Sequence, residues 1–303
     1  MQNDKLLGHL AAAGAYVIFG FNLIFCKDIA GSGVVPPVVL FSLRAVGATA
    51  LFWLVSLFLP RERVSGRDLL RIVLASFLGL FVTQLAFLAA IGMTTPIDAA
   101  VLGSLTPVYT MCFAFLFLGE PITGKKAGGV AVSLLGVLVL IYNSVHQTGA
   151  VDRTQPLGVL LMLVNGLSFA AYLGCFRPLI ARYGVVTFMK WMFLFALLIS
   201  LPFSWGGLMR LDVASITPKL GWEIGYLVVM ATFVAYFLIP VGQKHLRPTL
   251  VSMYSYLQPI IAAALGIAIG MDRFTWQKAL ATALVFGGVL LVNKSRAAGS
   301  SPK

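Results

Sequence analysis

The chain has 303 residues, of which 59% are hydrophobic and only 11% are charged. A soluble domain averages about 25% charged residues and could not bury this much apolar surface, so the composition excludes an ordinary soluble protein. The formal net charge of +12 could suggest nucleic-acid binding, but the Lys and Arg residues form short clusters between long apolar runs. That distribution is typical of a membrane protein, and no nucleic-acid partner is expected.

Ten apolar segments are long enough to cross a bilayer, since a helix needs about 20 apolar residues to span the hydrocarbon. We therefore predict an all-α integral membrane protein with ten transmembrane helices. In chain order the predicted spans are Leu7–Ile29, Pro37–Leu59, Leu69–Gly92, Ile97–Leu118, Gly124–Tyr142, Leu157–Leu179, Val185–Gly207, Leu220–Gln243, Thr249–Ile269 and Trp276–Val292.

The basic residues predict the orientation of these spans. With the N-terminus inside, most Lys and Arg residues fall in inner segments, including the runs "RERVSGR" and "KHLR". Cytoplasmic loops of membrane proteins carry such an excess of Lys and Arg. We expect a multi-pass protein of the bacterial inner membrane with both termini in the cytoplasm.

One long motif occurs twice in the chain. "LTPVYTMCFAFLFLGEPIT" begins at Leu105 and "LQPIIAAALGIAIGMDRFT" at Leu257, and an offset of 152 residues aligns their prolines and places Glu120 opposite Asp272. The same offset pairs Gly136 with Gly288. The chain is therefore predicted to consist of two five-helix halves, residues 1–148 and 149–303.

An odd number of helices in each half places the two halves in opposite orientations in the membrane. Such inverted repeats are common in secondary transporters, whose substrate site lies near the bilayer midplane between the repeats. The repeat therefore favours transport by alternating access over a static duplicated bundle.

The residues also resemble the EamA-type members of the drug/metabolite transporter superfamily, over nearly the whole chain. The resemblance rests on "VIFGFNLIFCK", on Pro37 with Arg44, and on "AAVLGSLTPVYTMCFAFLFLGEPIT" followed by "GGVAVSLLGVLVLI". It implies ten helices with cytoplasmic termini and a central cavity lined by helices 1, 3, 4, 6, 8 and 9. It also implies that helices 5 and 10 pack together, and that the substrates are amino acids and other small metabolites, mostly exported.

Small residues suggest how helices 5 and 10 would pack. Gly124 and Gly128 in helix 5, and Ala283 and Gly287 in helix 10, form small-x-x-x-small patterns. Such patterns let the backbones of two membrane helices approach closely. We expect these faces to meet.

Two prolines are predicted to interrupt the repeated helices. Pro107 and Pro259 each remove a backbone hydrogen bond in mid-helix, and a kink is expected at both sites. The carbonyl groups freed by a kink need a partner or a wet cavity. We therefore predict that Pro107 and Pro259 are conformational hinges in helices that line the cavity.

Polar and aromatic side chains at membrane depth are the candidates for substrate binding, because such groups are rare there and usually functional. Arg44 and Lys190 are the charged candidates, and Lys190 either contacts the substrate or extends to the inner headgroups. The complete set of cavity candidates is Asn22, Arg44, Gln84, Ser104, Thr106, Tyr109, Asn165, Tyr172, Lys190, Trp191, Thr232, Tyr236, Tyr254, Tyr256 and Gln258.

The sequence contains no recognisable enzyme motif, so we expect no catalytic residue, cofactor or metal. The predicted function is secondary transport, in the direction of export, of an amino acid or a related small polar metabolite by a monomer or weak homodimer. The alternatives are a sugar-phosphate or nucleotide-sugar exchanger, a membrane-embedded lipid-modifying enzyme, and a channel or scaffold. The first would need several cavity Lys or Arg residues, and the second an intramembrane acid and histidine cluster.

Overall fold

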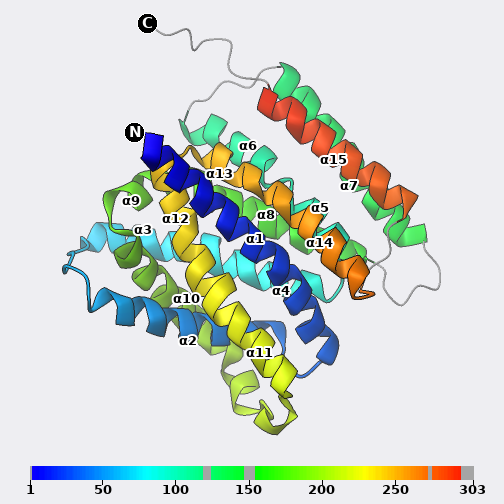
Figure 1. Cartoon of the computed structure of the whole chain (residues 1–303). Helices are drawn as coiled ribbons and strands as arrows, with labels where there is room; N and C mark the ends of the chain where they lie inside the picture. The colour runs from blue at the N-terminus through cyan, green and yellow to red at the C-terminus, as the bar shows by residue number, and fades with distance from the viewer. Residues whose placement is uncertain (1, 119–123, 147–153, 272–274, 295–303) are drawn as a thin grey trace, which may run out of the picture.

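A computed structural model describes residues 2–118, 124–146, 154–271 and 275–294, and all regular structure in these ranges is helical (Figure 1). Glu120 and Asp272, the acidic pair of the repeat, lie outside the described residues. Eight helical stretches in the described part are long and apolar enough to cross a membrane. The apolar portions of two further helices are shorter, Ala127–Val139 and Ala279–Gly288.

The helices follow the predicted spans closely, and several spans consist of consecutive helical pieces. The N-terminal part contains α1 (Gln2–Ser32), α2 (Pro37–Ser56), α3 (Gly66–Ser76), the π-helix η1 (Phe77–Val82), α4 (Thr83–Ile91), α5 (Pro96–Gly103), α6 (Thr106–Leu118) and α7 (Gly124–His146). The C-terminal part contains α8 (Pro156–Cys175), α9 (Arg177–Arg182), α10 (Val185–Met209), the short 3₁₀ turn η2 (Val213–Ser215), α11 (Pro218–Tyr226), the π-helix η3 (Leu227–Val234), α12 (Ala235–His245), α13 (Pro248–Ser252), the 3₁₀ turn η4 (Met253–Tyr256), α14 (Leu257–Ala268) and α15 (Trp276–Lys294).

Contacts between helices correspond when the two halves are exchanged. Helix α1 packs on α12 and α14, and its counterpart α8 packs on α4 and α6. Helix α2 contacts η3, just as α10 contacts η1. Helices α2 and α10 pack on each other, and so do α7 and α15, which lie side by side at one edge of the bundle (Figure 1). The repeated sequence thus forms a repeated set of packing contacts around α1 and α8.

The contact between α7 and α15 uses other small residues than predicted. A Cβ atom added to Gly136 would lie 2.8 Å from the Ala281 carbonyl oxygen, and one added to Gly288 would lie 2.4 Å from that of Gly129. By contrast, Gly124, Gly128 and Gly287 have open space around them. The predicted small-x-x-x-small faces were therefore wrong. The backbones approach closely at Gly136 and Gly288, the glycine pair that the repeat aligns.

Both halves contain a π-helix in mid-span, and at each one a threonine hydroxyl donates a hydrogen bond to a backbone carbonyl oxygen of the π-helix. Thr83 Oγ1 donates to the Leu78 carbonyl oxygen at 2.7 Å, and Thr232 Oγ1 donates to the Leu227 carbonyl oxygen at 2.6 Å. Each bond reaches back five residues, which is the spacing of a π-helix. Such segments are rare and occur frequently at functional sites.

The two proline positions coincide with interruptions of the helix. In the first half, α5 ends at Gly103 and α6 begins at Thr106, just before Pro107. Pro107 cannot donate to the Gly103 carbonyl, and the Thr106 hydroxyl donates to that oxygen instead, at 2.7 Å. In the second half the 3₁₀ turn η4 directly precedes α14, which contains Pro259. The interruptions lie at or just before the two predicted kink sites, while a bend and movement at these sites stay predictions.

Candidate functional site

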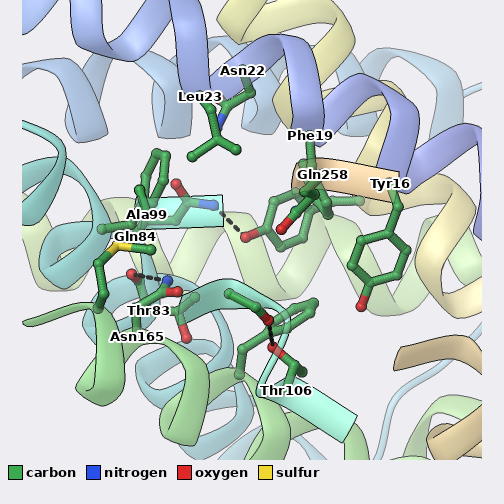
Figure 2. A pocket seen from close by; sticks show the side chains of 15 residues that line it. Tyr16, Phe19, Asn22, Leu23, Thr83, Gln84, Ala99, Thr106, Asn165 and Gln258 are labelled. Carbon is green, nitrogen blue, oxygen red and sulfur yellow. Dashed lines mark hydrogen bonds between the residues drawn. The ribbon is translucent and has the colours of Figure 1, made fainter. Parts of the chain in front are cut away.

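A small cavity lies at the centre of the bundle, where both halves meet (Figure 2). Its volume is about 70 Å³. The lining side chains come from α1, α4, α5, α6, α8, α12 and α14, which are the spans that the family resemblance implied. They are Tyr16, Phe19, Asn22, Leu23, Thr83, Gln84, Phe87, Ala99, Gly103, Thr106, Met162, Asn165, Phe169, Tyr236 and Gln258.

Amide and hydroxyl groups make up the polar part of this lining, and none of the described residues that line the cavity is charged. Gln84 Nε2 donates to the Tyr236 hydroxyl in a buried bond that joins α4 to α12. Asn165 Nδ2 donates to the Thr83 carbonyl oxygen at 2.8 Å and so joins α8 to α4. Figure 2 shows both bonds. The cavity is therefore a neutral polar site held by bonds between helices of both halves.

Two buried polar atoms of the lining have no hydrogen-bond partner, the Tyr16 hydroxyl and Gln84 Oε1. A buried polar group without a partner costs about 1–3 kcal/mol. The Tyr16 hydroxyl can donate or accept, and Gln84 Oε1 can accept. A ligand with a hydrogen-bond donor and an acceptor would satisfy both groups, so the lining is chemically suited to a small polar molecule.

Aromatic rings form the apolar part of the lining. The Phe19 ring meets Tyr236 edge to face with centroids 5.6 Å apart, and Phe169 approaches the same ring at 6.5 Å. Tyr16 and Phe19 were not among the predicted candidates. They occur three residues apart on the face of α1 that also presents Asn22, so the helical period counted from Asn22 would have revealed them.

The structure brings together a subset of the predicted site residues. Those that line the cavity are Asn22, Gln84, Thr106, Asn165, Tyr236 and Gln258. The candidates outside this lining are Arg44, Ser104, Tyr109, Tyr172, Lys190, Trp191, Thr232, Tyr254 and Tyr256.

Two of the hydroxyl groups outside the cavity have structural hydrogen-bond partners. Ser104 Oγ donates to the Val101 carbonyl oxygen at 2.6 Å. Tyr254 shares a 2.6 Å hydrogen bond with His9, near the N-terminus of α1.

Three other tyrosines lie against neighbouring helices. Tyr256 packs its ring on Phe286 of α15. Tyr172 is fully buried against Gly79 of η1, and Tyr109 lies against Gly166 of α8. Glycine at these positions makes room for the rings, so both tyrosines are packing residues in this conformation.

The two charged candidates also lie outside the cavity. Arg44 is 1% exposed, and its Nε donates to Thr232 Oγ1 at 2.8 Å, next to η3. Lys190 Nζ lies 5.0 Å from the ring centroid of Trp53, in a cation–π contact. Trp191 meets the same Trp53 ring edge to face. In the conformation described, the cation on α2 supports a π-helix and the cation on α10 covers an aromatic surface.

Comparison with known proteins places this site in a family. A sequence model of the EamA-like transporter family matches residues 6–142 and 156–294. The chain belongs to this family. It is an integral membrane protein of a transporter family, and the two matches correspond to the two sets of helices around the cavity.

Several relatives carry transporter names. The transporter YetK of Bacillus subtilis is 24% identical, with 74% of this chain and 68% of YetK covered. The inner membrane transporter YedA of Escherichia coli is 25% identical, with 64% and 60% covered. A probable amino-acid metabolite efflux pump of Escherichia coli is 26% identical over 91% of both chains. A solved crystal structure, 18% identical, has the same fold with a TM-score of 0.65 over 97% of both chains.

Proposed function

We propose that this protein is a secondary transporter that exports a small polar or zwitterionic metabolite, an amino acid or a related compound, across the inner membrane. The neutral polar cavity between the halves carries this proposal, because its unpartnered Tyr16 hydroxyl and Gln84 Oε1 await a polar ligand. The relative that covers 91% of the chain and is named as a probable amino-acid metabolite efflux pump supports the substrate class and the direction.

The proposal includes a topology of ten helices in two inverted repeats, with both termini in the cytoplasm. The exchangeable contacts around α1 and α8 support it, as do the paired π-helices. In this arrangement α7 and α15 are the fifth span of each half. Reporter fusions at Gln147 and Leu211 should read as periplasmic and a fusion at Gly66 as cytoplasmic. A cytoplasmic signal at Gln147 would contradict the inverted repeat.

The size of the cavity supports alternating access as the mechanism. Its volume of about 70 Å³ is well below the roughly 300–1,000 Å³ of small-molecule pockets. The site must therefore enlarge to accept a metabolite and close again around or behind it. The interruptions before Pro107 and Pro259 supply positions where α6 and α14 can change direction relative to α5 and η4.

The neutral lining also favours the proposed substrates over those of the alternative function, sugar-phosphate or nucleotide-sugar exchange. Sugar phosphates and nucleotide sugars carry phosphate groups, which proteins bind through Arg and Lys side chains. Arg44 and Lys190 are engaged elsewhere, with Thr232 and Trp53. The described cavity therefore favours a ligand whose polar groups match amides and hydroxyls.

Exchange of a labelled amino-acid mixture in proteoliposomes tests the function. Purified protein should catalyse saturable, protein-dependent exchange, and Gln84→Met should lower the initial rate about tenfold, since one hydrogen bond of about 1.4 kcal/mol is lost. Gln243→Met is the matched control, because Gln243 on α12 is also a buried glutamine but does not line the cavity. Absence of exchange for every amino acid would contradict the proposed substrate class, and flux without saturation would indicate a channel.

A further inference from the structure

A second, charged pocket lies at the end of the bundle opposite the N-terminus. We call it the vestibule. Its volume is about 560 Å³, within the roughly 300–1,000 Å³ of small-molecule sites. It is formed by the end of α1, by the segment from η2 to α11, and by Gly270 and Met271 after α14. Gly270 has a φ of +73°, a conformation that favours glycine at the end of a helix.

The vestibule lies next to the central cavity along α1. Leu23 lines the cavity and Lys27 lines the vestibule, and these residues are one helical turn apart, about 6 Å along the axis. In the proposed topology the vestibule opens to the periplasmic side. A substrate leaving the cavity along α1 would pass through it.

Charge distinguishes the vestibule from the cavity. Its lining contains Lys27, Asp28, Lys219 and Glu223, two cations and two carboxylates, together with Ser32, Ser215 and Thr217. Lys219 Nζ lies 2.5 Å from Asp28 Oδ2 and 3.7 Å from Glu223 Oε1. Lys27 Nζ donates to the Thr94 carbonyl oxygen at 2.8 Å. A primary ammonium group thus already occupies the space between the two carboxylates.

Glu223 is the residue that points to a ligand. It is 3% exposed, and its Oε2 is buried and accepts no hydrogen bond from a described N–H or O–H donor, although its carboxyl group lies beside that of Asp28. Taking a carboxylate out of water costs several kcal/mol unless it is paired, and Lys219 approaches only its other oxygen. The Lys219 side chain is 71% exposed, so it can leave this position at little packing cost.

We propose that the vestibule binds the zwitterionic head group of an α-amino acid, an inference that rests on the proposed function. The ligand ammonium group binds Glu223 Oε2 and Asp28 in place of the Lys219 ammonium. Lys219 turns to the ligand carboxylate, and Lys27 adds positive charge on the same side. The ion pairs of Lys219 with Asp28 and Glu223 are replaced by ion pairs of the ligand ammonium group with these carboxylates and of the ligand carboxylate with Lys219. A molecule with only one of the two charges therefore binds more weakly.

Protection of a cysteine reporter tests the vestibule directly. Ser215→Cys places a thiol at an exposed position of its lining, and mass spectrometry of peptides measures maleimide labelling at that position. Glycine is the probe, with glycinamide as its cationic analogue and N-acetylglycine as its anionic analogue. We expect glycine to slow labelling severalfold and saturably, and each analogue to do so more weakly. Labelling of Arg63→Cys, exposed at the other end of the bundle, should not change.

Two charge variants in the reporter background make the result decisive. Glu223→Gln should abolish protection by glycine. Lys219→Met should reverse the preference, because two carboxylates without their ammonium favour glycinamide over glycine. Equal protection by glycine in the parent and in Glu223→Gln would overturn the inference, as would a Lys219→Met variant that keeps the parental preference.

The proteoliposome exchange assay separates this inference from the proposed function. Exchange of amino acids without protection of Ser215→Cys would overturn the vestibule site and leave transport intact. Protection with the expected charge dependence, but without exchange of any amino acid, would support the site and contradict transport.

Discussion

The π-helices η1 and η3 share one backbone geometry but have different neighbours. In η1, the Leu78 carbonyl oxygen accepts from Thr83 and also from Ser168 of α8, and Thr83 itself lines the central cavity. In η3, the hydroxyl of Thr232 accepts from the buried guanidinium of Arg44. The repeat thus supplies two equivalent backbone distortions, and the side chains around them have diverged. The segment at η1 borders the cavity, whereas η3 binds the guanidinium group of Arg44.

This difference predicts unequal effects of one isosteric substitution at the two threonines. Thr232→Val leaves the Leu227 carbonyl and Arg44 Nε without their partner, and should lower the free energy of unfolding by about 2–3 kcal/mol because a charged donor is involved. Thr83→Val removes one neutral bond while Ser168 still donates to Leu78, so about 1 kcal/mol should be lost. Unfolding by SDS titration in mixed micelles measures both. Equal losses would contradict the different roles of η1 and η3.

Pro107 and Pro259 provide a second comparison between the two halves, in the helices α6 and α14. The carbonyl oxygen freed by Pro107 accepts from Thr106, which borders the cavity, and Pro259 lies next to Gln258, which also borders it. Replacement by alanine restores a backbone N–H that can straighten the helix. We expect Pro107→Ala and Pro259→Ala to fold nearly as the parent and to exchange substrate severalfold more slowly. Parental rates in both variants would show that the interruptions serve packing alone.

Substitution of Lys190 is expected to have the smallest effect on exchange and stability. Lys190 differs from Arg44, because it contacts an aromatic ring, whereas Arg44 contacts a π-helix. Its ammonium lies over Trp53, away from the cavity, and such contacts contribute about 0.5–2 kcal/mol. Lys190→Met keeps the apolar stem, and we expect undiminished exchange with a small loss of stability. A strong loss of exchange, measured with equal amounts of reconstituted protein, would show that Lys190 contacts the substrate, which is one of the two roles expected from the sequence.

The sequence predicted the helices well because apolar length and proline positions are local signals. Some boundaries were placed too late, and the sixth span is an example. The sixth span was predicted to reach Leu179, but α8 ends at Cys175 because Pro178 cannot continue the hydrogen-bond ladder and instead lies in the first turn of α9, which begins at Arg177. The π-helices were not predicted, since "FLGLFV" is apolar throughout and "LVVMATFV" is apolar except for Thr232, so only a threonine hydroxyl at the right spacing marks them.

The site was predicted in part for a related reason. Polar character at membrane depth identified Gln84, Asn165 and Tyr236, which do line the cavity. It could not separate them from Arg44, whose side chain is directed to Thr232, because the contact joins residues 188 positions apart. Glu223 was not among the predicted candidates, because the burial of its unpartnered oxygen depends on the packing of α1 against α11.

The small neutral cavity has a bioenergetic consequence. An inner membrane stores energy as a voltage, and each elementary charge that crosses releases about 2.3 kcal/mol per 100 mV. A cavity of about 70 Å³ holds only a few water molecules, and its described lining offers an inorganic ion no counter-charge. An ion would have to shed its hydration shell there, at a cost far above the driving voltage. In this conformation the described cavity is therefore a barrier to inorganic ions.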